Sequence, residues 1–474
     1  MTASVYSDKK VAVLPIKQKK APQLKRDLTL FDTSLLVIGS ILGSGIFLTT
    51  GIIAAYLSSP LLILCVWLVG GVATLCGALT FGELGAMYPS AGGQYIYLRE
   101  AYGPLSGFLF GWGFFWIIEC GGIAALAVGF AEYLGYFIPS LSTHQYLLQI
   151  KLFGFDYSLS FGQFTAVAAI LLLSGVNYFG IKQGAITQNI FTVIKVAAVF
   201  LLIVLGLGLG KKTGYIFYNQ QYTGGFIEIF PLFGLALIAV MWTYDGWYSA
   251  SITAGEIRNP ERNIPRGLII GTASITVIYF LMNCVYLLAL PVENIKGVVR
   301  IGEKASTQLF GATASSFISA LIMISIFGCL SATIIYGPRV YYAMSKDGAF
   351  FRSMAHVHPR YKVPSKSIFW QAVWSSLLCF SGTYEALFEY VIFALVIFFA
   401  ATGLAVFILR YKKPELPRPY KTWGYPVIPV IFILINLGIF FNTIIAQPLK
   451  SLLGLVILLL GVPAFLYWKR KNKN

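Results

Sequence analysis

Charged residues are scarce in this sequence. Only 11% of its 474 residues are Asp, Glu, Lys or Arg, whereas 57% are hydrophobic, and the mean hydropathy is +0.76. An ordinary soluble domain has roughly 25% charged residues. So few charges could not cover the core of a soluble protein of this length. The composition therefore excludes a soluble protein and favours an integral membrane protein.

The chain also lacks the residue sets that metal sites, disulfide scaffolds and enzymes use. Its six cysteines lie in apolar segments, and none stands in a C-x-x-C or Cys/His spacing. The histidines (His144, His356 and His358) fall between those segments, which hold no nucleophile–base set. We therefore expect no metal, no cofactor and no enzymatic activity, and we interpret the cysteines as small buried side chains.

Apolar stretches of about 20 residues recur along the chain, and such stretches predict membrane-spanning helices. They indicate an all-α integral membrane protein with twelve transmembrane helices. The predicted spans lie near residues 33–58, 60–87, 103–138, 163–180, 184–209, 228–254, 265–290, 314–344, 366–382, 385–410, 426–446 and 449–468.

A formal net charge of +17 could indicate binding to nucleic acid, but the distribution of Lys and Arg excludes it. With the N-terminus in the cytoplasm, the cytoplasmic segments carry 27 basic residues and the outer segments carry 7. Basic loops stay on the cytoplasmic side of a membrane. The sequence therefore predicts cytoplasmic tails at both ends, 1–27 and 469–474.

Two predicted spans contain interruptions in mid-membrane. In the first span, Gly43 and Gly45 flank a serine, and each glycine weakens a helix by about 1 kcal/mol. The pair could form a small-residue packing face. Alternatively, an unwound turn would expose backbone N–H groups that suit a carboxylate. In the sixth span, unwound carbonyl groups around Asp245-Gly246 could receive an ammonium group.

The interrupted spans are the first members of two five-span halves. An odd number of spans inverts the second half relative to the first, and paired breaks are typical of inverted-repeat transporters with a midplane site. We therefore divide the chain into a first repeat at 28–210, a second repeat at 226–410, and two further helices at 411–468.

Ionisable side chains inside the spans are costly and each needs an explanation. Lys195 lies too deep for comfortable snorkelling, and a desolvated lysine can exchange a proton. Glu119, in the third span, favours its neutral form if it is buried without a partner; it could contact substrate, relay a proton or pair structurally. Asp245 could bind substrate or cap the broken helix. Trp242, one turn before the second break, could gate the site or simply pack.

Several motifs together resemble the amino acid–polyamine–organocation superfamily, over a region from Leu28 to about Trp468. This resemblance implies a LeuT-like fold, with a five-plus-five inverted repeat and two extra helices. The matching motifs are Gly43-Ser44-Gly45-Ile46-Phe47, Phe81-Gly82-Glu83-Leu84-Gly85, Pro89-x-Ala91-Gly92-Gly93-x-Tyr95, Gly255-Glu256-Ile257-Arg258-Asn259-Pro260 and Asn263-Ile264-Pro265-Arg266.

The resemblance also implies a role for individual residues. The substrate carboxylate would meet the backbone amides of Gly43, Ser44 and Gly45. The ammonium would meet carbonyl groups near Ile41 and along Trp242, Tyr244 and Asp245, with Trp242 as the gate. Lys195 matches a lysine of sodium-independent members, in which its ammonium replaces a sodium ion and ties the first break to the eighth span.

The subfamily signals point in two directions. The segment Trp242–Trp247 is similar to the L-type exchangers, including serine/threonine exchangers and the cystine/dibasic type. Glu119 departs from most L-type members and resembles a glutamate of proton-coupled cationic amino acid transporters. The loop 139–162 lacks the cysteine by which animal L-type members bond a heavy chain. That absence implies a microbial-type transporter without a disulfide-linked heavy chain.

We therefore expect a secondary active transporter of L-amino acids in the plasma membrane, with the bacterial inner membrane as the expected location. It would work by alternating access without sodium, as an exchanger or a proton-coupled permease, with neutral amino acids as cargo. Lys195 and Glu119 are the candidate coupling residues. Glu119 and Asp245 leave open a cationic amino acid or amino acid/polyamine antiporter. A sensor that binds amino acids without transporting them is an alternative of another class.

Overall fold

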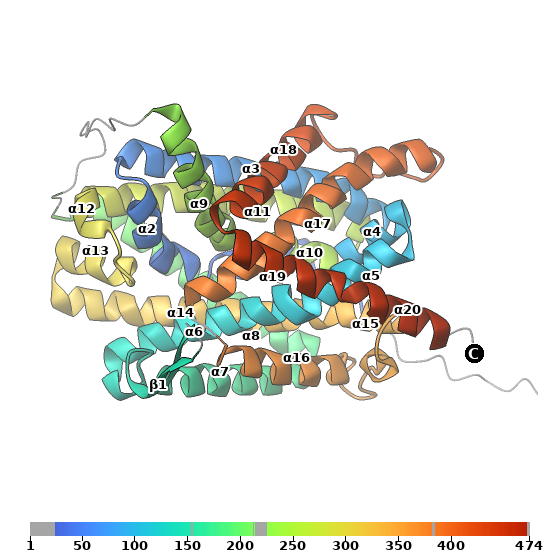
Figure 1. Ribbon diagram of the computed structural model, residues 1–474, viewed down its shortest axis with the longest axis horizontal. Coiled ribbons are helices and arrows are strands. Elements are labelled where there is room, and N and C mark those ends of the chain that lie inside the picture. Colours follow the sequence, from blue (N-terminus) through green and yellow to red (C-terminus); the bar gives the residue numbers. More distant parts are fainter. Residues whose placement is uncertain (1–23, 153–154, 212, 214–224, 382–383, 472–474) are drawn as a thin grey trace, which may run out of the picture.

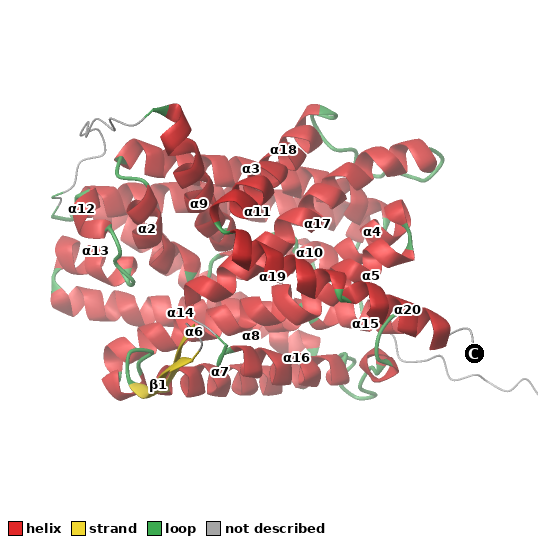
Figure 2. Ribbon diagram, viewed as in Figure 1, coloured by secondary structure: helices red, strands yellow, loops and turns green. Residues whose placement is uncertain are grey.

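The computed structural model describes residues 24–152, 155–211, 213, 225–381 and 384–471, and helices dominate this part of the chain (Figure 2). The α-helices are α1 Leu30–Ile41, α2 Gly45–Tyr56, α3 Pro60–Met87, α4 Gln94–Tyr102, α5 Pro104–Gly113, α6 Glu119–Phe137, α7 Phe161–Tyr178, α8 Ile181–Gly208, α9 Phe226–Thr243, α10 Ser249–Ile252, α11 Pro260–Ala289, α12 Val292–Ile295, α13 Ile301–Phe310, α14 Ala312–Tyr336, α15 Pro338–Lys346, α16 Ser365–Leu378, α17 Tyr384–Lys412, α18 Val427–Ala446, α19 Pro448–Leu459 and α20 Gly461–Lys471.

Ten helical stretches of the described chain are long and apolar enough to cross a membrane. They correspond to ten of the twelve predicted spans. The sixth predicted span contains a shorter apolar helix, Glu228–Thr243, and the ninth coincides with the 14-residue α16. Helix length and composition thus support ten crossings, while the count of twelve stays a prediction.

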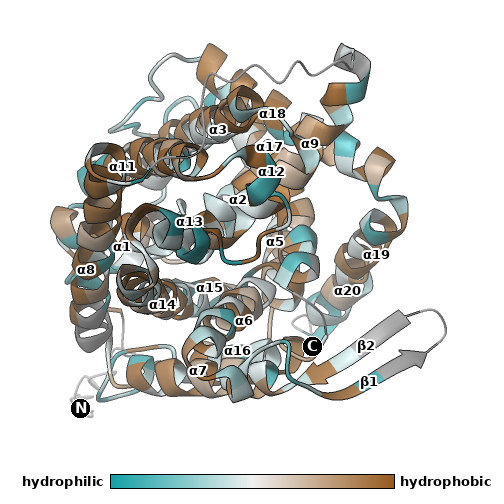
Figure 3. Ribbon diagram, turned by 90° about the vertical axis from the view of Figure 1, so that its left-hand side faces the viewer, coloured by the Kyte–Doolittle hydropathy of each residue, from teal (hydrophilic) through white to brown (hydrophobic). Residues whose placement is uncertain are grey.

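The lipid-facing character of the bundle is visible on its outside. Figure 3 shows hydrophobic colouring along the outer helices. Leu172, Phe200 and Ile445 are 61%, 64% and 80% exposed, respectively. Long apolar helices with such side chains turned outward fit a hydrocarbon solvent rather than water.

A β-hairpin corrects the strictly all-α prediction. Strand β1, Tyr146–Leu152, pairs antiparallel with β2, Phe155–Ser160, in the loop that follows α6. The hairpin projects from the helices in Figure 3. The segment lies outside the predicted spans, and pairing across the hairpin satisfies its backbone groups.

The two short helices of the first predicted span lie in the middle of the bundle. Helix α1 packs against α8, α11 and α14, and α2 packs against α9 and α13. Figure 3 shows α1, α2 and α13 among longer helices, and the order of these helices along the chain can be followed in Figure 1. The first span is therefore surrounded by protein, which permits an irregular backbone at membrane depth.

A buried ion pair ties two parts of the second half together. The guanidinium of Arg339 in α15 donates to both carboxylate oxygens of Glu256, at 2.8 and 3.0 Å, and both side chains are almost fully buried. Glu256 lies just beyond α10, so this bidentate contact fixes the segment after the second break against α15.

Candidate functional site

The predicted break in the first span is present. Helix α1 ends at Ile41 and α2 begins at Gly45, so three residues separate two helical pieces. The first N–H groups of a helix have no partner within the helix, and the helix dipole makes that end attractive to anions. The turn thus presents backbone donors near the middle of the span.

The second break faces the first. Helix α9 ends at Thr243 and α10 begins at Ser249, and Gly246 between them has a φ of +90°, which favours glycine. A Cβ at Gly246 would lie 2.9 Å from the carbonyl oxygen of Ser40 in α1. The two breaks therefore touch, and glycine is what lets the backbones approach.

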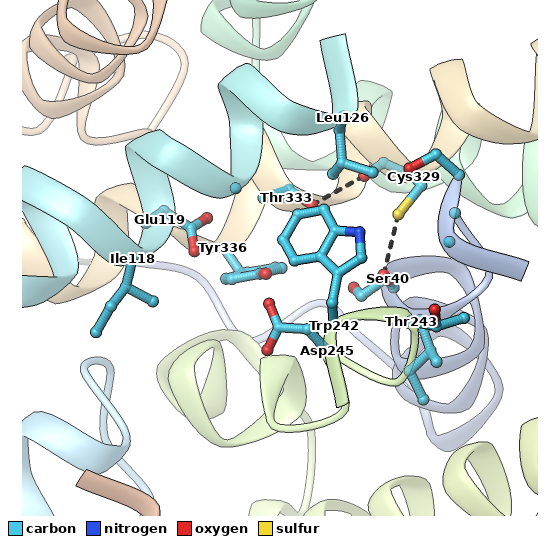
Figure 4. A pocket seen from close by; sticks show the side chains of 15 residues that line it. Ser40, Ile118, Glu119, Leu126, Trp242, Thr243, Asp245, Cys329, Thr333 and Tyr336 are labelled. Carbon is cyan, nitrogen blue, oxygen red and sulfur yellow. Dashed lines mark hydrogen bonds between the residues drawn. The ribbon is translucent and has the colours of Figure 1, made fainter. Parts of the chain in front are cut away.

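A small cavity lies between the breaks (Figure 4). Its volume is about 20 Å³, which is close to the space of one water molecule. An amino acid needs more room, so the site in this arrangement is too small to hold one. The lining residues come from both breaks, from α6 and from α14: Ser40, Ile41, Gly43, Ser44, Gly45, Ile118, Glu119, Gly122, Leu126, Trp242, Thr243, Asp245, Cys329, Thr333 and Tyr336.

Most of the predicted substrate residues line this cavity, but Tyr244 does not. The Tyr244 side chain packs against Trp67 and Tyr279, and its hydroxyl donates to the Trp67 carbonyl at 3.4 Å. The residue belongs to the break, yet its ring points into the neighbouring aromatic packing. Any contact of Tyr244 with substrate would have to come from its backbone.

The carbonyl groups at the ends of the two half-helices share a donor. The Tyr279 hydroxyl in α11 lies 2.7 Å from the Ile41 carbonyl oxygen and 3.2 Å from that of Thr243. A single hydroxyl thereby joins the end of α1 to the end of α9. The Ile41 carbonyl also accepts a hydrogen bond from the Gly43 N–H at 2.8 Å, so both of its lone pairs are in use, whereas the Thr243 carbonyl has a lone pair left for an ammonium group.

Trp242 covers the cavity together with two aromatic side chains of α17. Its indole N–H donates to the Tyr384 hydroxyl at 2.8 Å, and its ring stacks on Phe388 with 5.7 Å between centroids. The Tyr384 hydroxyl also lies 3.1 Å from the hydroxyl of Ser44. A chain of contacts therefore runs from α17 through Trp242 to the first break, while the role of Trp242 as a gate stays a prediction.

Lys195 holds the first break from the side of α8. Its ammonium donates to the carbonyl oxygens of Gly39 and Leu42 at 2.6 and 2.8 Å, and the residue is fully buried. Ser325 of α14 donates to the same Leu42 carbonyl at 3.5 Å. This arrangement matches the predicted tie between the first break and the eighth span. Lys195 does not line the cavity that contains Glu119, so the two residues occupy separate places.

Glu119 lies at a local irregularity of its helix. A π-helical turn, Phe114–Ile118, precedes it directly, and such turns are frequent at functional sites. The Glu119 side chain is 2% exposed, and one carboxyl oxygen has no hydrogen-bond partner. Asp245 also has a buried oxygen without a partner. In Figure 4 both carboxyl groups point toward the ring of Tyr336.

The contribution of α14 was not predicted. Cys329, Thr333 and Tyr336 recur at helical spacing and line one side of the cavity. The Cys329 thiol donates to the Ser40 carbonyl at 3.0 Å. These residues carry no charge at neutral pH, so the criterion of charged side chains inside a span did not identify them. Their recurrence on one face of an otherwise apolar helix is a signal that could have found them.

Comparison with known proteins agrees with this geometry. The family model described as amino acid permease matches residues 28–463. The serine/threonine exchanger SteT of Bacillus subtilis is 33% identical over 456 residues, which cover 95% of this chain and 98% of SteT. No metal-binding group of three or more His, Cys, Asp or Glu residues occurs among the described residues.

Human relatives match over similar lengths. The b(0,+)-type amino acid transporter 1 is 28% identical, with 94% of this chain and 88% of the relative covered. The cystine/glutamate transporter is also 28% identical, with 97% and 89% covered. These relatives are transporters rather than enzymes. The chain therefore belongs to the amino acid permease family, within the amino acid–polyamine–organocation superfamily, and is a multi-pass membrane protein.

Proposed function

We propose that this protein is a sodium-independent secondary transporter of L-amino acids that works by alternating access through the cavity between the two helix breaks. The observation that carries the proposal is that both breaks open onto one cavity in the middle of the bundle. A cavity formed by two broken helices in mid-span suits a transporter that opens to one side at a time. We further propose cytoplasmic termini and a plasma-membrane location.

Neutral amino acids are the first choice of cargo. The carboxylate would accept hydrogen bonds from the N–H groups of Gly43, Ser44 and Gly45, and the ammonium would reach the Thr243 carbonyl. The exchange of serine and threonine named for SteT supports a small neutral side chain.

Cationic amino acids or polyamines are the second candidate cargo. Glu119 and Asp245 both line the cavity, and none of the lining residues in the described part of the chain is Lys, Arg or His. Two ionised carboxylates without a protein cation would attract a positively charged side chain. This reading depends on both groups being charged.

Lys195 supports transport without sodium. Its ammonium contacts two carbonyl oxygens of the first break, where a bound cation would otherwise be needed to satisfy them. The loop 139–162 contains no cysteine, so we propose a transporter without a disulfide-linked heavy chain.

Uptake of radiolabelled amino acid into proteoliposomes tests the function and its coupling. Vesicles are prepared with or without internal amino acid, each with and without an inward proton gradient, in sodium-free buffer. Uptake that requires internal substrate identifies an exchanger, and gradient-driven uptake into empty vesicles identifies a proton-coupled permease. Binding without uptake in all four conditions would leave a sensor and overturn the proposal.

Competition distinguishes the two classes of cargo. Unlabelled alanine, serine, leucine, arginine and putrescine are added in turn to the uptake assay. Inhibition by alanine or serine supports neutral cargo. Inhibition by arginine or putrescine while the neutral amino acids fail would replace the first choice by the second.

A further inference from the structure

Gln371 in α16 is a buried polar side chain beside the site. It is fully buried, its amide nitrogen donates to the Ile334 carbonyl at 3.4 Å, and its amide oxygen has no partner. The reason for the first contact lies in α15. Pro338 has no backbone N–H, so the carbonyl of Ile334, four residues earlier, loses its usual helical donor.

This contact fixes which way the Gln371 amide points. The Ile334 carbonyl can only accept a hydrogen bond, so the NH₂ group must face it and the amide oxygen must point elsewhere. A Cβ at Gly337 would lie 2.4 Å from that oxygen and 2.6 Å from Oε1 of Glu119. Both oxygens thus face the same spot beside Gly337 and lie within about 5 Å of each other.

These are also the two oxygens that lack partners. Oε1 of Glu119 and Oε1 of Gln371 are both buried without a hydrogen-bond partner. If Glu119 were ionised, two acceptors would face each other and both would remain unsatisfied, which is costly in a buried place. If Glu119 carries a proton, its O–H can donate to the Gln371 oxygen, and one hydrogen bond satisfies both groups.

The surroundings of Glu119 also disfavour a second negative charge. Its titratable neighbours come from the second break, α6, α14, α15 and the turn before α10, and Asp245 alone among them is an acid that ionises readily. A nearby carboxylate favours the neutral form of its neighbour. These neighbours are Asp245, Cys120, Cys329, Tyr336, Tyr341 and Tyr248.

We propose that Gln371 is a positioning residue that keeps the proton on Glu119 in this arrangement of the site, by accepting a hydrogen bond from the protonated carboxyl group. The role of this hydrogen bond in transport rests on the proposed function, whereas the placement of Gln371 beside Glu119 does not. The cavity then carries at most one buried negative charge, from Asp245, rather than two. That charge balance favours the neutral cargo over the cationic one.

Infrared difference spectroscopy on the purified, reconstituted protein tests the proton directly. The spectrum of Glu119→Gln is subtracted from that of the unaltered protein at neutral pH. A carbonyl band of a protonated carboxylic acid is expected in the unaltered protein and absent from the variant. Absence of that band in the unaltered protein would overturn the proposal, whether or not any other variant folds.

The Gln371→Met variant tests the acceptor. Methionine has a similar length but no strong acceptor, so the carboxylic acid band is expected to move to higher frequency or to vanish. Ser367→Ala, on the same helix, is the control and should leave the band in place. A band unchanged in Gln371→Met would show that Glu119 bonds to something else, such as a water molecule, and would overturn the role of Gln371.

The pH dependence of exchange gives the functional readout, measured with equal pH on both sides of the membrane. Loss of the acceptor should move the midpoint for loss of uptake to lower pH by about one unit, which corresponds to one hydrogen bond. The shift should be absent when Gln371→Met is combined with Glu119→Gln, and a shift that persists there would contradict the proposal. If the unaltered protein shows the infrared band but no uptake, the result would contradict the proposed transport function and not the role of Gln371.

Discussion

The ammonium of Lys195 is bound by the backbone itself. Gly39 and Leu42 offer it carbonyl oxygens on either side of the point where α1 ends. Those carbonyl groups belong to the last turn of a helix, where intrahelical donors are missing. The buried ammonium of Lys195 therefore donates to carbonyl oxygens that would otherwise need water or an ion. Lys195 does this without occupying the cavity between the breaks.

Replacing Lys195 by methionine should abolish uptake. Each buried carbonyl oxygen left without its donor costs about 1–3 kcal/mol, so the first break should lose its shape. We expect uptake to fall by more than about tenfold, since 1.4 kcal/mol corresponds to a factor of ten. The control is Lys450→Met, which removes a half-exposed lysine paired with Glu389. Normal uptake by Lys195→Met would contradict the assigned role.

At the scale of elements, the site depends on how closely two broken helices approach. A Cβ on Gly45 would lie 2.5 Å from the Thr243 hydroxyl oxygen and 2.8 Å from the Thr243 Cα. The second of these neighbours is backbone and cannot rotate away. The contact between α2 and α9 is thus set by the absence of a side chain at one position.

Gly45→Ala is expected to separate α2 from α9 and to abolish uptake. The overpacking should also lower the unfolding temperature, because forcing an added methyl group into a packed contact costs about 1–3 kcal/mol. Gly438→Ala is the matched control, since a Cβ there meets nothing within 4 Å. Equal uptake and equal unfolding temperatures for the two variants would show that the close contact between α2 and α9 is not needed for transport or stability.

Sequence reasoning located the breaks better than the walls of the site. Gly43, Gly45 and Asp245 stand out in a hydrophobic run, because a span has few other reasons to contain them. The Tyr384 hydroxyl and the Gln371 amide give no such signal, since their roles come from contacts between helices far apart in the chain. The hairpin at 146–160 was missed because its pairing lies outside the apolar pattern used for the spans.

At the scale of the whole molecule, the cavity is too small for an amino acid, and the segments around it are fastened to the rest of the bundle. On one side Trp242 and Tyr384 cover the cavity. Elsewhere, the Glu256–Arg339 pair holds the segment after the second break against α15. The proposed alternating access would require such contacts to separate in turn, so their strength would set how readily the site opens.

Glu256→Gln should destabilise the protein by about 3–5 kcal/mol, because it leaves the buried Arg339 without its counter-charge. The double variant Glu256→Gln with Arg339→Met should recover part of that loss. Glu100→Gln is the control, because Glu100 pairs with partly exposed Arg99 and Lys413, and such pairs contribute about 0–1 kcal/mol. Thermal unfolding in detergent compares the variants. Equal unfolding temperatures for all of them would refute the stabilising role of the Glu256–Arg339 pair.

The central claim is that amino acids cross the membrane through the cavity between the breaks without sodium. The most direct measurement is uptake of labelled amino acid, in sodium-free buffer, into proteoliposomes that contain unlabelled amino acid. The account predicts uptake well above that of protein-free vesicles, unchanged when sodium is added, and lost in Lys195→Met. Uptake that appears only with sodium, or binding of the amino acid without any uptake, would contradict it.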